Sequence, residues 1–185
     1  KAWVHERGGK FMYLGGNGLN CEVEFPDEQT MVVKNGDGRS QRAQETESRF
    51  HIYNESEANL LGVVFTHPGI MTAAPYQVLD AKHWIFADTG VKTGDVFGEA
   101  SLHERIPGGA SGHETDKTSP SSPANTEIVA RGLNPDQGGA EIVHYQTASG
   151  GAVYSAGSIT YPASILVDEV VSKITANVIK RFTAV

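Results

Sequence analysis

The chain has 185 residues, of which 39% are apolar, 20% charged and 8% aromatic. This length suffices for one domain with a substantial hydrophobic core and is too short for two large domains. Twenty-two acidic against fifteen basic side chains give a net charge of −7, which argues against binding to nucleic acid phosphates or to an anionic membrane surface. No apolar run approaches the roughly 20 residues that span a bilayer. We therefore expect neither nucleic acid nor a membrane as a partner.

Cysteine usage and the first residues indicate where the chain belongs. Cys21 is the single cysteine, so no intramolecular disulfide can form, and a reducing compartment suits the chain. Lys1 is not an initiator methionine, and no signal-peptide core follows it. We expect a cytoplasmic protein of which this chain is a part.

The first predicted unit is a helix end followed by a strand. Residues 3–9 (WVHERGG) are typical of the last turn of a helix with its glycine stop. Residues 10–14 (KFMYL) predict a short buried strand, and residues 15–18 (GGNG) predict a tight loop after it. In open parallel sheets such a loop lies at the carboxyl end of a strand, where ligands bind.

The middle of the chain is less regular. Residues 21–25 and 31–34 predict two short strands of a hairpin-like excursion, and residues 35–58 predict a solvated surface segment. Residues 75–79 and 83–86 could each form a short strand. The segment 98–124 is rich in Gly, Ser and Pro and predicts a long loop, and loops of that length are often functional.

The last third returns to regular structure. Residues 127–131, 141–147 and 152–156 predict strands, the last two joined as a hairpin. Asp168 is placed to cap a C-terminal amphipathic helix, whose apolar positions recur at helical spacing: Val170, Val171, Ile174, Val178, Ile179 and Phe182.

Two loops carry residues suited to chemistry. The loop 15–18 matches neither a P-loop nor a dinucleotide-binding fingerprint. The Asn17 side chain either accepts hydrogen bonds from backbone N–H groups of its own turn or points its amide across the carboxyl edge of the sheet. The loop 108–117 (GGASGHETDK) places His113 beside Glu114, a pair suited to acid/base work or metal binding, or else simply solvated surface. Asp116, two residues further on, is expected to be structural or solvated.

Other reactive side chains are assigned no role. A zinc protease is unsupported because the second His of H-E-x-x-H is missing after His113. Cys21 begins an alternating strand rather than a nucleophile elbow, so we interpret it as a core residue. Four histidines have no partner at a recognisable spacing: His51, His67, His83 and His144.

Three stretches together resemble the C-terminal part of the N,N-dimethylformamidase large (beta) subunit family: residues 8–18 (GGKFMYLGGNG), 108–117 (GGASGHETDK) and 150–159 (GGAVYSAGSI). The resemblance implies an α/β fold similar to class I glutamine amidotransferases, a flavodoxin-like, mainly parallel sheet flanked by helices. We expect this sheet to be partial, with inserted β-hairpins and a C-terminal helix. Residues 1–185 would form a single domain, the C-terminal portion of a larger catalytic domain.

The family resemblance also implies an activity, the hydrolysis of the C–N bond of a small amide at a mononuclear non-haem iron. Two tyrosines and a glutamate hold that iron in the family, and we expect these ligands upstream of this chain, with no metal ligand inside it. By the match, Asn17 is the amide near the metal, Glu114 the general base with His113 beside it, and Lys34 a nearby basic residue. The implied partners are the small amide, the rest of the parent chain, and a small subunit or further copies of the chain.

One departure from the family leaves an alternative open. Residues 19–21 (LNC) follow the GGNG loop where the family often has aromatic residues, which leaves the identity of the amide open. The alternative function is a non-catalytic module that keeps the glutamine amidotransferase-like fold for binding or structure. A His-x-Glu-Tyr-Trp-like motif upstream would favour the enzyme.

Overall fold

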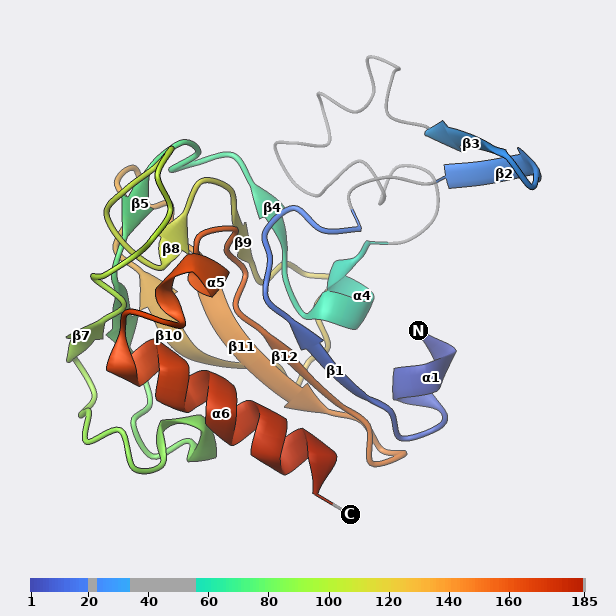
Figure 1. Cartoon of the computed structure of the whole chain (residues 1–185). Coiled ribbons are helices and arrows are strands. Elements are labelled where there is room, and N and C mark those ends of the chain that lie inside the picture. Colours follow the sequence, from blue (N-terminus) through green and yellow to red (C-terminus); the bar gives the residue numbers. More distant parts are fainter. Residues whose placement is uncertain (20–22, 34–55, 185) are drawn as a thin grey trace.

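A computed structural model describes residues 1–19, 23–33 and 56–184. Its main feature is a six-stranded sheet in the order β1-β12-β11-β10-β6-β7 (Figure 1). The strands are β1 (Lys10–Tyr13), β12 (Ala152–Ser155), β11 (Glu141–Gln146), β10 (Glu127–Gly132), β6 (Tyr76–Val78) and β7 (Val96–Phe97). The chain is thus a mixed α/β protein, as predicted.

The direction of the strands differs from the expectation. β1 and β12 are parallel, whereas the other neighbouring pairs of this sheet are antiparallel. The expected mainly parallel sheet is therefore not found within the described residues. The reason is that β10, β11 and β12 follow one another through short connections, which impose antiparallel pairing, whereas parallel strands need a long crossover.

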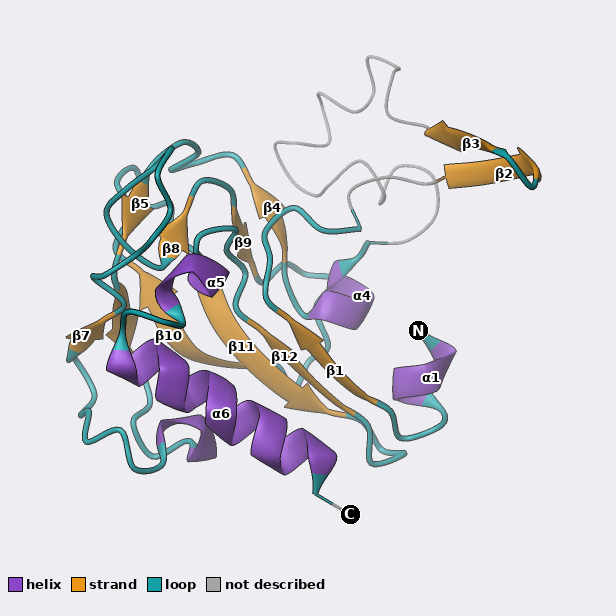
Figure 2. Cartoon of the chain, viewed as in Figure 1, coloured by secondary structure: helices purple, strands orange, loops and turns teal. Residues whose placement is uncertain are grey.

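The described residues also form three two-stranded sheets (Figure 2). β2 (Val23–Asp27) and β3 (Thr30–Val33) form the predicted hairpin. The other two pairs are β4 (Val64–Thr66) with β9 (Thr115–Lys117), and β5 (Ala73–Ala74) with β8 (Ser111–Gly112). Strands β8 and β9 fall within 98–124, so the expected long loop is in part structured.

Helices cover both faces of the sheet. α6 (Glu169–Thr183) packs on one face, and the short helices α1 (Ala2–His5) and α4 (Ala58–Leu61) pack on the other. The described residues also contain α5 (Tyr161–Ser164) and a 3-10 turn, η1 (Trp84–Phe86). None of the helices within the described ranges is both long and apolar enough to cross a bilayer.

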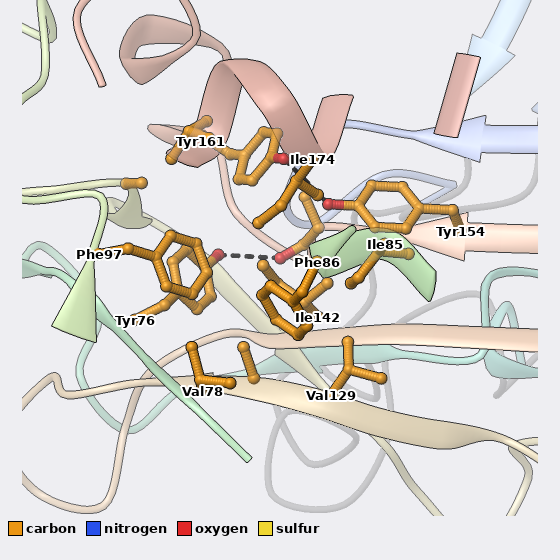
Figure 3. Packing of buried hydrophobic residues seen from close by; sticks show 14 of the residues in the cluster. Tyr76, Val78, Ile85, Phe86, Phe97, Val129, Ile142, Tyr154, Tyr161 and Ile174 are labelled. Atoms are coloured by element: carbon orange, nitrogen blue, oxygen red, sulfur yellow. Dashed lines mark hydrogen bonds between the residues drawn. The ribbon is translucent and has the colours of Figure 1, made fainter. Parts of the chain in front are cut away.

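The alternation of side chains along β11 and β12 divides the core into two layers. Ile142 and Tyr154 face α6, where they meet Ile174, and Figure 3 shows this layer with Tyr76 and Tyr161. The Tyr76 hydroxyl donates to the Ala156 carbonyl at 2.9 Å, and the Tyr154 hydroxyl donates to Tyr161 at 3.0 Å. The buried tyrosines therefore keep their polar ends paired. On the other face Val143, Tyr145 and Val153 pack with Val4 and Leu61.

Several predicted elements are confirmed, and one is wrong. α1 ends before Gly8, whose φ of +73° is readily adopted by glycine. The strands predicted at 10–14, 75–79, 127–131, 141–147 and 152–156 are present. Residues 84–86 form η1 where the sequence predicts a strand at 83–86, because the His83 side chain accepts the Ile85 N–H and caps a helical turn.

The predicted cap of α6 is confirmed and carries a second contact. The Asp168 carboxylate accepts the Val171 N–H at 3.0 Å and the Gly98 N–H at 2.9 Å. Asp168→Ala is therefore expected to lower the free energy of unfolding by about 1–2 kcal/mol. Urea denaturation measures this change, with Glu169→Gln on the exposed first turn as the control. Equal small losses in both variants would show that the cap contributes nothing.

Candidate functional site

Three segments meet at the carboxyl edge of β1 and β12 (Figure 1). Tyr13 pairs with Ser155 at the ends of these parallel strands, so the loops that follow leave at the same edge. The third segment is β9, because the Asp116 N–H donates to the Gly157 carbonyl at 2.8 Å and Thr115 bridges Ser158. The predicted loop 15–18 and the predicted loop 108–117 are thereby brought together.

The Asp116 carboxyl lies at the centre of this edge. It is 1% exposed, accepts the Asn17 N–H at 2.7 Å and receives the Tyr13 hydroxyl at 3.0 Å. The Gly18 N–H donates to the Tyr13 hydroxyl at 2.7 Å. Asn17 itself adopts a φ of +53°, a left-handed conformation that asparagine tolerates better than most residues. The buried carboxyl and the phenol thus fix the backbone of the glycine-rich loop.

Burial raises the pKa values of the Asp116 carboxyl and the Tyr13 phenol. Burial raises the pKa of Asp116 to about 8, helped by the negative charges of Glu57 and Glu114 and opposed by the hydrogen bonds from Asn17 and Tyr13. Burial, with Asp116 beside it, raises the pKa of the Tyr13 phenol well above its ordinary value. Near pH 7 the Asp116 carboxyl is therefore mostly a neutral acid and Tyr13 a neutral phenol.

The Asn17 side chain keeps an unused polar atom. Its carboxamide oxygen is buried and has no hydrogen-bond partner among the described residues. A buried acceptor without a partner costs roughly 1–3 kcal/mol, a cost that a ligand with a donor would remove. Asn17 is thus held by its backbone, and its side-chain oxygen keeps an unused acceptor position within the described structure.

Glu114 lies against the same loop. A Cβ added at Gly16 would come within 2.5 Å of the Glu114 carbonyl oxygen, so only glycine permits this approach. The Ile159 N–H donates to that carbonyl at 3.4 Å, and the Glu114 side chain is partly buried. The two residues that the sequence singled out first, Asn17 and Glu114, therefore belong to segments that touch.

The other sequence-predicted site residues are placed differently. His113 adopts a φ of +61°, and its ring lies 5.8 Å from the ring of His103. The backbone N–H of His113 donates to the Thr72 carbonyl at 3.0 Å, which fixes His113 next to β5. Lys34 lies outside the described residues, as do Cys21 and His51.

A buried polar network supports the loop that carries Glu114. The Ser111 hydroxyl donates to Asn134 at 2.7 Å, and the Asn134 amide donates to the Thr72 hydroxyl at 2.9 Å. The Ser158 hydroxyl accepts the Gly112 N–H at 2.8 Å and donates to the Ala110 carbonyl at 2.8 Å. These bonds hold the glycine-rich segment in one conformation, which a positioned catalytic group requires.

A second cluster lies on the α6 face of the sheet, in residues to which the sequence assigned no role. His83 precedes η1, Glu127 begins β10, and His144 lies in β11. The two rings approach to 3.3 Å between His83 Nε2 and His144 Nδ1, and Glu127 Oε2 lies 3.3 Å from His144 Nδ1. His83 and His144 are 61 residues apart, so no sequence spacing could have paired them.

The family of the chain follows from a comparison with models of known families. The model described as N,N-dimethylformamidase beta subunit-like, C-terminal, matches residues 2–173. The chain belongs to this family. The resemblance predicted from the three glycine-rich stretches is thereby confirmed, and the match includes Asn17 and Glu114. A search of curated proteins finds no significant match.

The edge around Asn17 does not by itself fit the iron that the N,N-dimethylformamidase family implies. Its buried oxygen donors, the Asp116 carboxyl and the Tyr13 hydroxyl, are hydrogen-bonded to each other and to the Asn17 and Gly18 N–H groups, and two oxygens do not make a ligand set for an iron ion. Across the described ranges, the one group of three His, Cys, Asp or Glu side chains close enough to share an ion is His83, Glu127 and His144. We therefore assign iron to no residue of the Asn17 edge.

Proposed function

We propose that this chain supplies part of the active site of an N,N-dimethylformamidase-like hydrolase that cleaves the C–N bond of a small amide. The observation that carries the proposal is the state of Asn17, whose backbone is fixed by Asp116 while its buried carboxamide oxygen lacks a partner in the described structure. This arrangement lies inside the family match. It also lies at the carboxyl edge of two parallel strands, a usual place for ligands.

The residues at the edge that carries Asn17 have different roles in the proposed amide hydrolysis. In the reaction, water adds to the amide carbonyl carbon, the C–N bond breaks, and the amine leaves with a proton. Glu114 acts as the general base that takes a proton from the attacking water and returns one to the amine. The Asn17 carboxamide oxygen accepts a hydrogen bond from the attacking water, and its NH₂ group donates to the substrate carbonyl oxygen. Tyr13 and Asp116 position Asn17 and do not transfer the proton themselves.

Iron and the partners of the chain belong to the same proposal. The iron ligands would lie in the parent protein outside these 185 residues, as the family resemblance implies, because among the described residues the Asn17 edge offers only the hydrogen-bonded oxygens of Asp116 and Tyr13. The name of the family supports a beta-subunit role, with a further subunit as a partner. A single cysteine in the chain suits the cytoplasm as the place of action.

The glutamine amidotransferase-like fold is proposed for the parent domain. In the described sheet β1 is the terminal strand, and it runs parallel to β12. Further parallel strands from the rest of the parent chain would pair with the open edge of β1, which would also cover Phe11 and Tyr13. The 185 residues would then be the C-terminal portion of one larger catalytic domain.

Replacement of Asn17 tests the proposal. In the parent protein, Asn17→Gly is expected to lower kcat/KM for small amides by about 10-fold to 100-fold, the equivalent of one lost hydrogen bond. Glycine adopts the φ of +53° without strain, so the fold is kept.

Leu19→Gly is the matched control, because Leu19 has a φ of +52° and is 51% exposed. It introduces the same backbone freedom into the same loop and is expected to leave turnover within about twofold. If Asn17→Gly also stayed within threefold of the parent protein, Asn17 would have no part in catalysis.

A further inference from the structure

The cluster of His83, Glu127 and His144 has the geometry of a metal site. The three atoms that face one another are His83 Nε2, His144 Nδ1 and Glu127 Oε2. The two imidazole nitrogens are 3.3 Å apart, and the carboxylate oxygen lies 3.3 Å from His144 and 3.7 Å from His83. Ligand atoms about 2.0–2.1 Å from a tetrahedral zinc ion lie roughly 3.3 Å from one another. One ion could therefore touch all three atoms with little movement.

The surroundings of the two imidazoles restrict their movement. His83 is 9% exposed and His144 is 2% exposed, so both rings are packed inside the protein. The Trp84 ring stands edge-on to the His144 ring at 5.2 Å between centroids, which restricts its rotation.

We propose that His83, Glu127 and His144 bind one divalent transition-metal ion of the zinc class, at a site separate from the edge that carries Asn17. Two imidazoles and one carboxylate favour such an ion over Mg²⁺ or Ca²⁺, which prefer oxygen ligands throughout. The Glu127 side chain is 59% exposed, so the ion can enter from solvent and complete its coordination with water. The role of the site is independent of the amide hydrolysis proposed above.

In a competing interpretation, His83, His144 and Glu127 bind no metal and are joined to one another by hydrogen bonds. His83 Nδ1 accepts the Ile85 N–H at 3.4 Å, an arrangement that places the His83 proton on Nε2. A metal on Nε2 would move this proton to Nδ1 and break that long contact. The positive charge of Arg181, which stacks on Trp84 with 5.1 Å to the ring centroid, also opposes a cation. The charges of Glu127 and Asp80 favour one.

Metal titration distinguishes the two interpretations. The purified protein is dialysed against a chelator and titrated with Zn²⁺ by calorimetry, and Co²⁺ is added separately to record its absorption bands. The proposal expects one Zn²⁺ per chain at this site and Co²⁺ bands of a four-coordinate ion with nitrogen ligands. Glu127→Gln keeps the size of the exposed side chain and is expected to weaken Zn²⁺ binding by at least about tenfold. His83→Gln is expected to weaken it further.

Matched controls remove the same chemical groups elsewhere. Glu99→Gln and His67→Gln replace an exposed carboxylate and an exposed imidazole outside the cluster, and both are expected to bind Zn²⁺ within twofold of the unmodified protein. Glu127 and His83 lie outside the edge that carries Asn17. A variant of either residue that loses Zn²⁺ binding but keeps its amide turnover would therefore support the metal site and leave the proposed hydrolase function untouched. Equal Zn²⁺ binding by the unmodified protein and by Glu127→Gln and His83→Gln, or no binding at all, would overturn the proposal in favour of the hydrogen-bonded cluster.

Discussion

Glu114→Gln in the parent protein is expected to lower kcat for amide hydrolysis by about 10²-fold to 10⁴-fold, the usual contribution of a general base. Glutamine keeps the size and the hydrogen-bonding ability of the side chain but cannot accept a proton. The backbone of Glu114 packs on Gly16 and accepts the Ile159 N–H, and the substitution leaves both contacts in place. Folding and metal content should therefore be unchanged while turnover falls.

The control for this experiment is Glu104→Gln, an exposed glutamate in the segment that precedes the Glu114 loop. Its turnover should stay within about threefold of the parent protein, a change of less than roughly 1 kcal/mol in the barrier. If Glu114→Gln behaved in the same way, the residue would be loop surface and its catalytic role would be refuted. Asp116→Asn cannot serve as an inert control, because the carboxyl of Asp116 is buried and holds Asn17.

Elements governed by local patterns could be predicted from the sequence. The glycine stop at Gly8, the apolar run of β1 and the Asp168 cap each act within a few residues. The hairpin of β11 and β12 depends on a short connection with glycine, which is also local. For α6 the helical spacing correctly gives Val171, Ile174 and Val178 as the buried stripe, whereas Ile179 is 50% exposed.

Elements that depend on distant partners could not be predicted in this way. β8 and β9 contain few apolar residues and exist because they pair with β5 and β4, which precede them by tens of residues. The directions of the sheet strands likewise depend on how non-adjacent segments pair. Residues 83–86 contain aromatic and β-branched side chains, which favour strands. The His83 side chain accepts the Ile85 N–H, and this cap stabilises a helical turn instead.

The site shows the same division. Asn17 and Glu114 stand in recognisable glycine-rich stretches, so a family resemblance singled them out. Tyr13 and Asp116, which fix Asn17, are 103 residues apart and meet only through the fold. Asp116 belongs to a charged stretch that predicts solvated surface, and nothing local indicates that its carboxyl is 1% exposed. β9 has only three residues, and the first two, Thr115 and Asp116, are both buried, so no alternation of polar and apolar residues marks the strand in the sequence.

The protonated Asp116 carboxyl makes a second strong prediction, a pH dependence of stability. Its pKa is raised from 3.8 to about 8 by folding, so the folded chain binds this proton more tightly than the unfolded chain does. The stabilisation is therefore complete below about pH 4, falls as the pH rises towards 8, and is lost above it, at ~1.4 kcal/mol for each pH unit inside this window. Chemical denaturation between pH 4 and pH 9 measures the slope.

Asp116→Asn isolates this contribution, because a carboxamide imitates the neutral acid. Its oxygen can accept the Asn17 N–H, so this contact with the loop is kept. Its NH₂ group replaces the oxygen that accepts the Tyr13 hydroxyl, so the bond to Tyr13 reverses and the NH₂ group donates to the Tyr13 oxygen. Below about pH 4 the variant is expected to match the unmodified protein in stability, and its advantage should grow with pH to several kcal/mol near pH 9. Taking the difference between the two proteins removes the titration of every other group, including His83 and His144. Parallel stability curves across this range would show that Asp116 is ionised in the folded chain, and Asn17 would then be held by a carboxylate.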